Sequence, residues 1–121
     1  MPRFVVLEHA SPLGRHWDFM LQTGGVLTTW SLSQPPAAPG PIPARALPDH
    51  RPDYLDYEGP ISGGRGAVTR WDQGTYQLEH QEPGQTIVLL QGEKLTGRAV
   101  LQRSGDDPRQ WTVSFHSTRK K

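Results

Sequence analysis

Apolar and polar residues along this chain form short alternating runs that have the length of β-strands rather than of helices. Three such runs lie near the N-terminus, at residues 4–7, 16–22 and 26–32. Gly24 and Gly25 separate the second run from the third, as in a β-hairpin. The pattern therefore predicts that a sheet begins within the first residues of the chain.

The second half of the chain repeats this pattern. We expect further strands at residues 67–71, 75–79, 86–91, 98–102 and 111–116. Turn-forming sequences separate them, among them residues 72–74 and 82–84. Seven or eight short strands at this spacing are typical of a barrel or sandwich. We predict an all-β fold, a compact closed or partly open β-barrel with long loops.

Prolines interrupt the middle of the chain. Six of them lie within residues 33–48, too many for a central strand or a helix interior because proline lacks the backbone N–H. We predict an ordered surface loop there, followed by a short extended or single-turn piece at residues 54–57. Residues 118–121 are predicted to be a frayed basic tail, and residues 1–121 to form one domain.

Composition narrows the possible functions. Thirteen Lys and Arg oppose 12 Asp and Glu, a net charge of +1, so any nucleic-acid site must be local. The chain has no cysteine, which leaves His, Asp and Glu as metal ligands. No apolar run approaches the roughly 20 residues of a membrane span, and the start lacks a signal-peptide core. We expect a cytoplasmic protein without a membrane partner.

The most informative stretch lies in the second expected strand. Alternation places His16, Asp18 and Met20 on one face, while the bulky apolar residues between them face the core. His9, at the end of the preceding strand, can reach this face across a short loop. Two histidines and one aspartate form a three-ligand set with open positions, suited to Mn, Fe or Zn. Because a His-x-Asp pattern is short, ordinary surface or hydrogen-bonded histidines are the alternative.

A second polar cluster follows the proline-rich segment, at residues 49–59. It contains His50, Arg51 and two tyrosines in a segment too polar for the core. One interpretation is a solvated loop whose carboxylates pair with Arg51. The other is a group that binds or protonates an anionic substrate, with His50 as general acid or phosphate contact. Glycines at 63, 64 and 66 predict a tight turn, or a backbone that approaches a phosphate.

Several segments together resemble a known family. They are HWDF at 16–19, YLDYEG at 54–59, WDQGTY at 71–76 and GEKLTGR at 92–98, with residues 4–9, 26–30 and 49–50. In this order they resemble the 3′-phosphoesterase module of the bacterial and archaeal DNA ligase D family, in a short stand-alone form. The resemblance implies a β-barrel that trims damaged or ribonucleotide-bearing DNA 3′ ends in a manganese-dependent reaction and leaves a 3′-hydroxyl.

The resemblance also implies roles for individual residues. His9, His16 and Asp18 correspond to the family's metal ligands, His50 to its phosphate-contacting histidine, and Tyr54 to the tyrosine four residues later. The implied cofactor is Mn²⁺ or another divalent transition metal. The implied partners are DNA or RNA/DNA 3′ ends and separate ligase and polymerase proteins, and we expect a monomer.

The chain departs from the family pattern in more than one respect. Met20 stands where the family usually has an arginine aimed at the substrate phosphate, and the two metal-binding histidines are one residue farther apart than usual. We expect Arg45, Arg51 or Arg15 to supply the phosphate contact instead, with Arg65 as a further candidate, since a guanidinium grips phosphate bidentately.

Two other functions fit parts of the pattern. A non-catalytic module with the same barrel and metal site would bring DNA ends to a ligase or polymerase, and Met20 would mark the lost activity. A non-haem iron oxygenase would also use two histidines and a carboxylate. The oxygenase leaves His50 and Tyr54 without a role.

Overall fold

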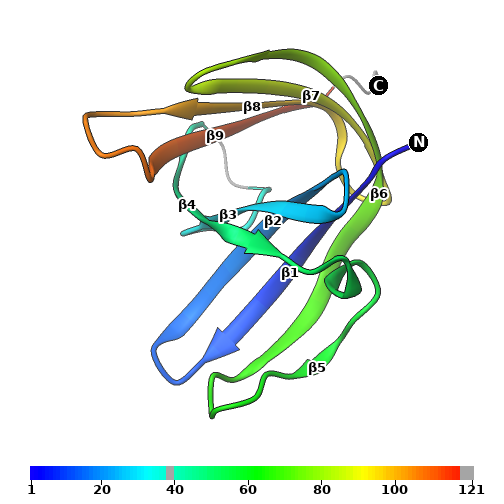
Figure 1. Ribbon diagram of the computed structural model, residues 1–121, viewed down its shortest axis with the longest axis vertical. Coiled ribbons are helices and arrows are strands. Elements are labelled where there is room, and N and C mark those ends of the chain that lie inside the picture. Colours follow the sequence, from blue (N-terminus) through cyan, green and yellow to red (C-terminus); the bar gives the residue numbers. More distant parts are fainter. Residues whose placement is uncertain (38–39, 118–121) are drawn as a thin grey trace.

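The computed structural model describes residues 1–37 and 40–117, and there the chain forms nine antiparallel strands and one 3₁₀ turn (Figure 1). The predicted tail at 118–121 lies outside the described residues. The elements are β1 Arg3–Ser11, β2 Gly14–Thr23, β3 Val26–Leu32, β4 Ile42–His50, η1 Pro52–Leu55, β5 Gly59–Pro60, β6 Ala67–Glu82, β7 Gln85–Gly92, β8 Thr96–Arg103 and β9 Gln110–Ser117.

The strands close into a ring. Hydrogen bonding runs in the order β1-β2-β3-β4-β9-β8-β7-β6, and β6 also pairs with β1, while the two-residue β5 pairs with β6. In Figure 1, β6 rises along the right side of the molecule from β1 in the lower half to β7 in the upper half. The predicted all-β, barrel-like fold is confirmed. No helix of the described residues is long and apolar enough to span a membrane.

The turn predicted at residues 72–74 is wrong, because these residues continue β6, which is 16 residues long. Val6 pairs with Asp72 and Leu7 with Arg70, so Trp71 is an extra residue that interrupts the register between β1 and β6. Such a bulge increases the local bend and twist of a strand. The turn-like composition therefore marks a bulged strand that passes from one neighbour to the next.

The loop predicted from the prolines is also wrong in its second part, which forms β4. The carbonyl of Pro43 accepts the backbone N–H of Ser33 (3.1 Å), which lies just beyond the end of β3. The nitrogen of Pro43 points to the same side, so the missing N–H falls where β3 has already ended. Pro48 lies between Leu47 and His50, where the pairing with β3 shifts register. Both prolines occupy positions where the ladder needs no N–H.

The wall that carries β1 and β2 has an apolar cluster on each side. Phe4, Val6 and Phe19 point into the barrel and join the inner core. The outer cluster consists of Val5, Leu7, Met20, Leu27, Leu55 and Val68, with Tyr54 and Ile61 packed against it. Alternation along the strands therefore creates two buried faces on one wall.

The segment between β4 and β6 covers the outer cluster. It contains η1, whose first residue is Pro52 and whose buried residue is Leu55, and this single turn confirms one of the two forms expected after the prolines. Burying Leu55 stabilises the cover by about 1.5 to 3 kcal/mol. Polar groups at the edge of the outer cluster thus lie between the wall and its cover.

A buried carboxylate anchors β6 next to its bulge. Asp72 is 1% exposed and accepts four backbone N–H groups, those of Gln73, Glu93, Lys94 and Leu95 (2.8 to 3.1 Å). The 71–76 and 92–98 sequences are therefore held together by one side chain. Gly92 permits this approach, because a β-carbon there would lie 2.5 Å from Asp72 Oδ2.

Candidate metal centre

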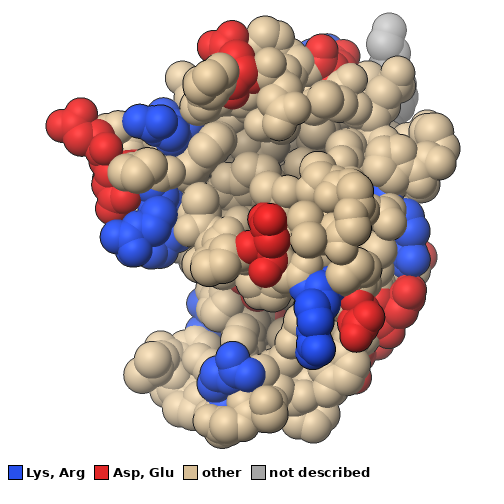
Figure 2. Space-filling view, viewed as in Figure 1, with Lys and Arg blue, Asp and Glu red and all other residues tan. Residues whose placement is uncertain are grey.

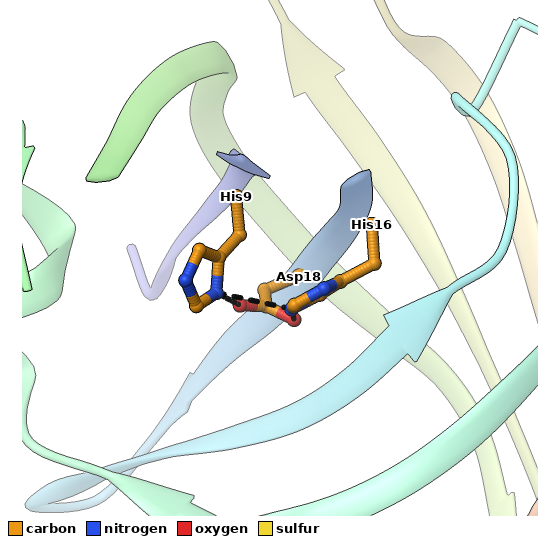
Figure 3. A group of neighbouring side chains, drawn as sticks. All are labelled: His9, His16 and Asp18. Atoms are coloured by element: carbon orange, nitrogen blue, oxygen red, sulfur yellow. Dashed lines mark hydrogen bonds and ion pairs between the residues drawn. The ribbon is translucent and has the colours of Figure 1, made fainter. Parts of the chain in front are cut away.

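His9, His16 and Asp18 lie together on the outer face of the β1–β2 hairpin (Figure 3). His9 pairs directly with His16 across the two strands, and Asp18 pairs with Leu7 of the outer cluster. Residues 16 and 18 share a face because successive side chains of a strand alternate. The prediction that these three side chains come together is confirmed.

The donor atoms converge on one point. His9 Nδ1 lies 3.1 Å from His16 Nε2, His16 Nε2 lies 3.2 Å from Asp18 Oδ1, and His9 Nδ1 lies 3.9 Å from Asp18 Oδ2. One ligand atom from each residue lies within 4.8 Å of the others. Separations of this size are what bonds of about 2.0 to 2.2 Å to a shared divalent ion produce. Two imidazoles and one carboxylate suit a transition metal.

A backbone carbonyl orients His9. His9 Nε2 lies 2.6 Å from the carbonyl oxygen of Arg65, and because a carbonyl only accepts, Nε2 carries the proton. This hydrogen bond turns Nδ1 toward His16 and Asp18. Partners of this kind fix the tautomer and orientation of metal-ligating histidines.

Asp18 is buried without the hydrogen bonds that a buried carboxylate needs. It is 4% exposed, and Oδ1 receives no well-aligned hydrogen bond. The short contact with Asp18 raises the pKa of His16 above its ordinary value, against the opposing effect of partial burial. A buried carboxylate is costly unless a cation accompanies it. The orphaned oxygen and the two ring nitrogens beside it fit a bound metal ion.

A small pocket of about 70 Å³ opens beside two of the three candidate ligands, His9 and Asp18. It is lined by Leu7, His9, Asp18, Met20, His50, Tyr54, Ile61, Arg65 and Val68. The structure therefore brings the second polar cluster of the sequence to the first, although His50 ends β4 and Tyr54 lies on η1.

The two aromatic side chains from this cluster are arranged for different contacts. His50 Nδ1 lies 2.9 Å from the carbonyl of Pro48, so Nδ1 donates to this carbonyl and Nε2 is left for another partner. The ring of Tyr54 meets that of His50 edge to face, with centroids 5.6 Å apart. His50 can accept or deliver a proton at Nε2, and Tyr54 can donate from its hydroxyl.

Comparison with known proteins places this arrangement in a family. The family model for the DNA Ligase D 3′-phosphoesterase domain matches residues 7–103, which include all three candidate ligands, His50 and Tyr54. This chain belongs to the DNA ligase D 3′-phosphoesterase domain family. The resemblance inferred from the sequence is thereby confirmed.

Curated relatives of this DNA ligase D domain are larger proteins. The multifunctional non-homologous end joining DNA repair protein LigD of Mycobacterium tuberculosis H37Rv is 36% identical over 115 residues, covering 86% of this chain and 15% of the relative. LigD of Pseudomonas aeruginosa is 36% identical over 113 residues, covering 84% and 13%. LigD of Mycolicibacterium smegmatis is 31% identical over 120 residues, covering 85% and 16%. The chain spans less than a fifth of the length of these relatives.

Met20 forms an apolar part of the pocket in this DNA ligase D domain. It is 1% exposed and packs in the outer cluster with Val5 and Leu7, while it also lines the pocket. A thioether offers no charge to an anion. A cation for a phosphate in this pocket therefore has to come from another element.

The arginines predicted to replace it lie in different places. Arg15 forms an ion pair with Glu8 (2.5 Å), and Arg51 lines a neighbouring cavity. Arg65 lines the pocket itself. The sequence offered Arg65 only as a further candidate, and it gave no sign that the Arg65 carbonyl holds His9.

Arg45 lies on the same outer wall at a greater distance along the sheet. Cross-strand pairing places it in one row with Asp18, with Ser31 between them. The backbone N–H of Arg109 holds the pKa of Asp107 below its usual range, and the charge of Arg45 adds to this effect. Arg45 thus interacts electrostatically with Asp107 in the β8–β9 loop.

The glycines before β6 are the signal that could have identified Arg65. Gly66 has a φ of +92°, and a β-carbon there would lie 1.9 Å from the carbonyl oxygen of Ala10. Only glycine allows the turn to lie this close to the end of β1. That close approach brings the carbonyl of Arg65 to His9.

Proposed function

We propose that this chain is a metal-dependent phosphoesterase, a hydrolase that removes a 3′-phosphate or a 3′-terminal ribonucleotide from nucleic-acid ends and leaves a 3′-hydroxyl. The observation that carries the proposal is the buried, orphaned carboxylate of Asp18, which lies between two imidazoles and opens on a pocket with His50 and Tyr54. The relatives are named as non-homologous end joining proteins, and end processing in that repair pathway is the role we propose.

His9, His16 and Asp18 would hold the metal, and we propose Mn²⁺ or another divalent transition metal. When bound there, such an ion supplies Lewis-acid polarisation of a phosphoryl oxygen and a lowered pKa of coordinated water. The carbonyl of Arg65 keeps His9 in the required tautomer. The apolar neighbours Leu7 and Met20 limit water around the ligands.

His50 and Tyr54 would act on the phosphate. With Nδ1 held by the carbonyl of Pro48, Nε2 of His50 is available as a general acid toward the leaving oxygen or as a phosphate contact. The hydroxyl of Tyr54, on the neighbouring ring, would donate a hydrogen bond to the charge that develops on phosphate.

A second candidate function rests on Met20. This residue gives the pocket an apolar wall where the family resemblance implies a phosphate-binding arginine. In this second role the domain is a non-catalytic module that presents DNA ends to separate ligase and polymerase proteins. In either role we propose a monomer that works in the cytoplasm on DNA or RNA/DNA 3′ ends. An iron oxygenase would give His50 and Tyr54 no task.

The test uses a 5′-labelled primer-template with either a 3′-phosphate or one terminal 3′-ribonucleotide. Wild-type protein is incubated with Mn²⁺ or with chelator, beside His16→Ala, His50→Ala and the control His80→Ala, whose exposed side chain pairs with Glu82. We expect conversion that requires metal, His16 and His50 and that survives in the control. End binding without conversion of either substrate by folded, metal-loaded protein would establish the binding module instead.

A further inference from the structure

A second, larger cavity adjoins the metal pocket. Its volume is about 370 Å³, and it is lined by Arg51, Asp53, Tyr54, Tyr57, Pro60, Ile61, Ser62 and Arg65. Tyr54, Ile61 and Arg65 also line the metal pocket, so the two spaces share these walls. The segment between β4 and β6, which covers the outer cluster, thus forms a cavity that neither the candidate metal ligands nor His50 line.

We propose that this cavity is the subsite for the nucleic-acid strand next to the reacting 3′ terminus, with Arg65 and Arg51 binding backbone phosphate and Tyr57 contacting the sugar or base. This inference rests on the proposed function and deepens it. It assigns strand recognition to the 51–65 segment rather than to Arg15 or Arg45.

The charge of this cavity favours an anion. Among residues 1–37 and 40–117, the guanidinium of Arg65 bonds only neutral acceptors, the carbonyl oxygen (2.8 Å) and the hydroxyl (3.3 Å) of Ser62. The side chain of Arg51 makes no hydrogen bond or ion pair within the part of the chain that the structure describes. Asp53 is the one carboxylate in the lining, so two arginines and one aspartate leave it a net positive charge.

Four other arginines are already paired with carboxylates: Arg3 with Asp56 (2.9 Å), Arg15 with Glu8 (2.5 Å), Arg98 with Glu79 (2.7 Å) and Arg109 with Asp107 (3.5 Å). On the face shown in Figure 2, Lys and Arg lie interspersed with Asp and Glu rather than in one continuous stripe. Recognition of a nucleic-acid strand therefore depends on local cations that lack a partner.

The position of Arg65 connects phosphate binding to the metal centre. Its carbonyl accepts the Nε2–H of His9, and its side chain is tied back to Ser62 in the same turn. One residue therefore orients a metal ligand and lines both cavities. A phosphate held by this guanidinium lies at the boundary between the reacting terminus and the rest of the strand.

The size and aromatic lining of the cavity suit a nucleotide. Its volume lies within the range of small-molecule sites, about 300 to 1,000 Å³. Tyr57 is 37% exposed, its ring lies edge to face with Tyr54 at 5.9 Å, and its hydroxyl donates to the carbonyl of Pro60. A ring fixed in this way offers a face or edge to a sugar or base, and base–aromatic contacts tolerate many sequences.

Binding without turnover tests the subsite directly. A 5′-fluorescein-labelled single strand with a 3′-phosphate is titrated in chelator with wild type, Arg51→Gln, Arg65→Gln and the control Arg103→Gln, which removes the same charge from the β8 end. We expect each subsite variant to lose about tenfold in affinity and to lower the salt slope by roughly 0.7. The control keeps both values, and Asp53→Asn binds more tightly.

Conservative substitution and melting separate binding from folding. Arg65→Lys retains the charge, and we expect it to recover part of the affinity that Arg65→Gln loses. Each variant must show the wild-type thermal midpoint by circular dichroism. Equal affinities and salt slopes for Arg51→Gln, Arg65→Gln and Arg103→Gln would overturn the subsite.

Turnover distinguishes this inference from the proposed function. With Mn²⁺, kcat/KM is measured for the 3′-phosphorylated primer and for a mononucleoside 3′-phosphate. We expect the kcat/KM of the primer, divided by that of the mononucleoside 3′-phosphate, to fall about tenfold in Arg51→Gln. In Arg103→Gln this ratio should stay at the wild-type value. If the wild type converts neither substrate, the proposed function fails while the binding titration still decides the subsite.

Discussion

Two buried aspartates on the same barrel differ in what surrounds them. Asp72 accepts four backbone N–H groups, whereas Asp18 contacts two imidazoles and keeps an oxygen without a well-aligned hydrogen bond. Their exposed fractions, 1% and 4%, are nearly the same. The difference teaches that burial alone does not identify a functional carboxylate. The groups around the carboxylate identify its role. Four backbone N–H groups satisfy the charge of Asp72, whereas the charge of Asp18, beside two histidine rings, can still bind a cation.

Removing Asp72 should have the largest effect on stability. Asp72→Ala leaves four backbone N–H groups without their acceptor, and we expect the free energy of unfolding to fall by about 4 kcal/mol or more. Urea denaturation followed by circular dichroism measures this loss. In chelator, Asp18→Asn should change the same quantity by less than about 1 kcal/mol, because it removes an unsatisfied charge. Equal losses of unfolding free energy in the two variants would contradict the proposed difference between Asp72 and Asp18.

Metal should stabilise the domain through Asp18 and not through Asp72. At a Mn²⁺ concentration of 100 times Kd, we expect wild type to gain about 2.7 kcal/mol of unfolding free energy. Asp18→Asn should lose most of this gain. Thermal melting with Mn²⁺ or chelator gives the comparison, and a gain that persists in Asp18→Asn would show that the ion binds elsewhere.

The partner of His9 offers a finer test. Gly66→Ala would place a β-carbon 1.9 Å from the carbonyl oxygen of Ala10, so the turn must move and withdraw the carbonyl of Arg65 from His9. We expect metal affinity to fall by roughly tenfold or more, as for lost orienting partners in other metal sites. Isothermal titration with Mn²⁺ measures it. Gly64→Ala, where a β-carbon meets nothing within 4 Å, controls for backbone strain at positive φ.

The smallest predicted effect concerns alkaline pH and Tyr76, which lies on β6 four residues after Asp72. Burial raises the pKa of Tyr76, whose hydroxyl donates to the carbonyl of Gln22 (2.7 Å). The neutral form is favoured in the folded state, so this contribution is full below the unfolded pKa of 10.0 and is lost as pH rises through the folded pKa. Tyr76→Phe should flatten the fall in stability above pH 10, measured by urea denaturation. An unchanged slope would contradict it.

Local pattern predicted one part of the site and missed another. Alternation along β2 placed His16 and Asp18 on one face, and the structure confirms it. The carbonyl that holds His9 comes from Arg65, 56 residues away, and no local pattern encodes that contact. The role of the metal and of His50 stays a prediction.

Prediction of the fold failed where long-range contacts decide. Residues 72–74 have the composition of a turn, but the Asp72 side chain binds amides up to 23 residues away and the strand continues. Prolines in β4 fit because β3 ends beside one and shifts register beside the other. Propensity describes a residue alone, whereas these outcomes depend on which strand becomes its neighbour.

The two-sided wall has a consequence for how such a domain can change over time. Phe19 belongs to the inner core, while Asp18 and Met20, its immediate neighbours in sequence, face outward. A substitution on the outer side alters what the wall recognises without reshaping the interior that keeps the barrel folded. Met20 packs in the outer cluster and also lines the metal pocket, so a change at this one position would alter the chemistry of the site and leave the inner core in place.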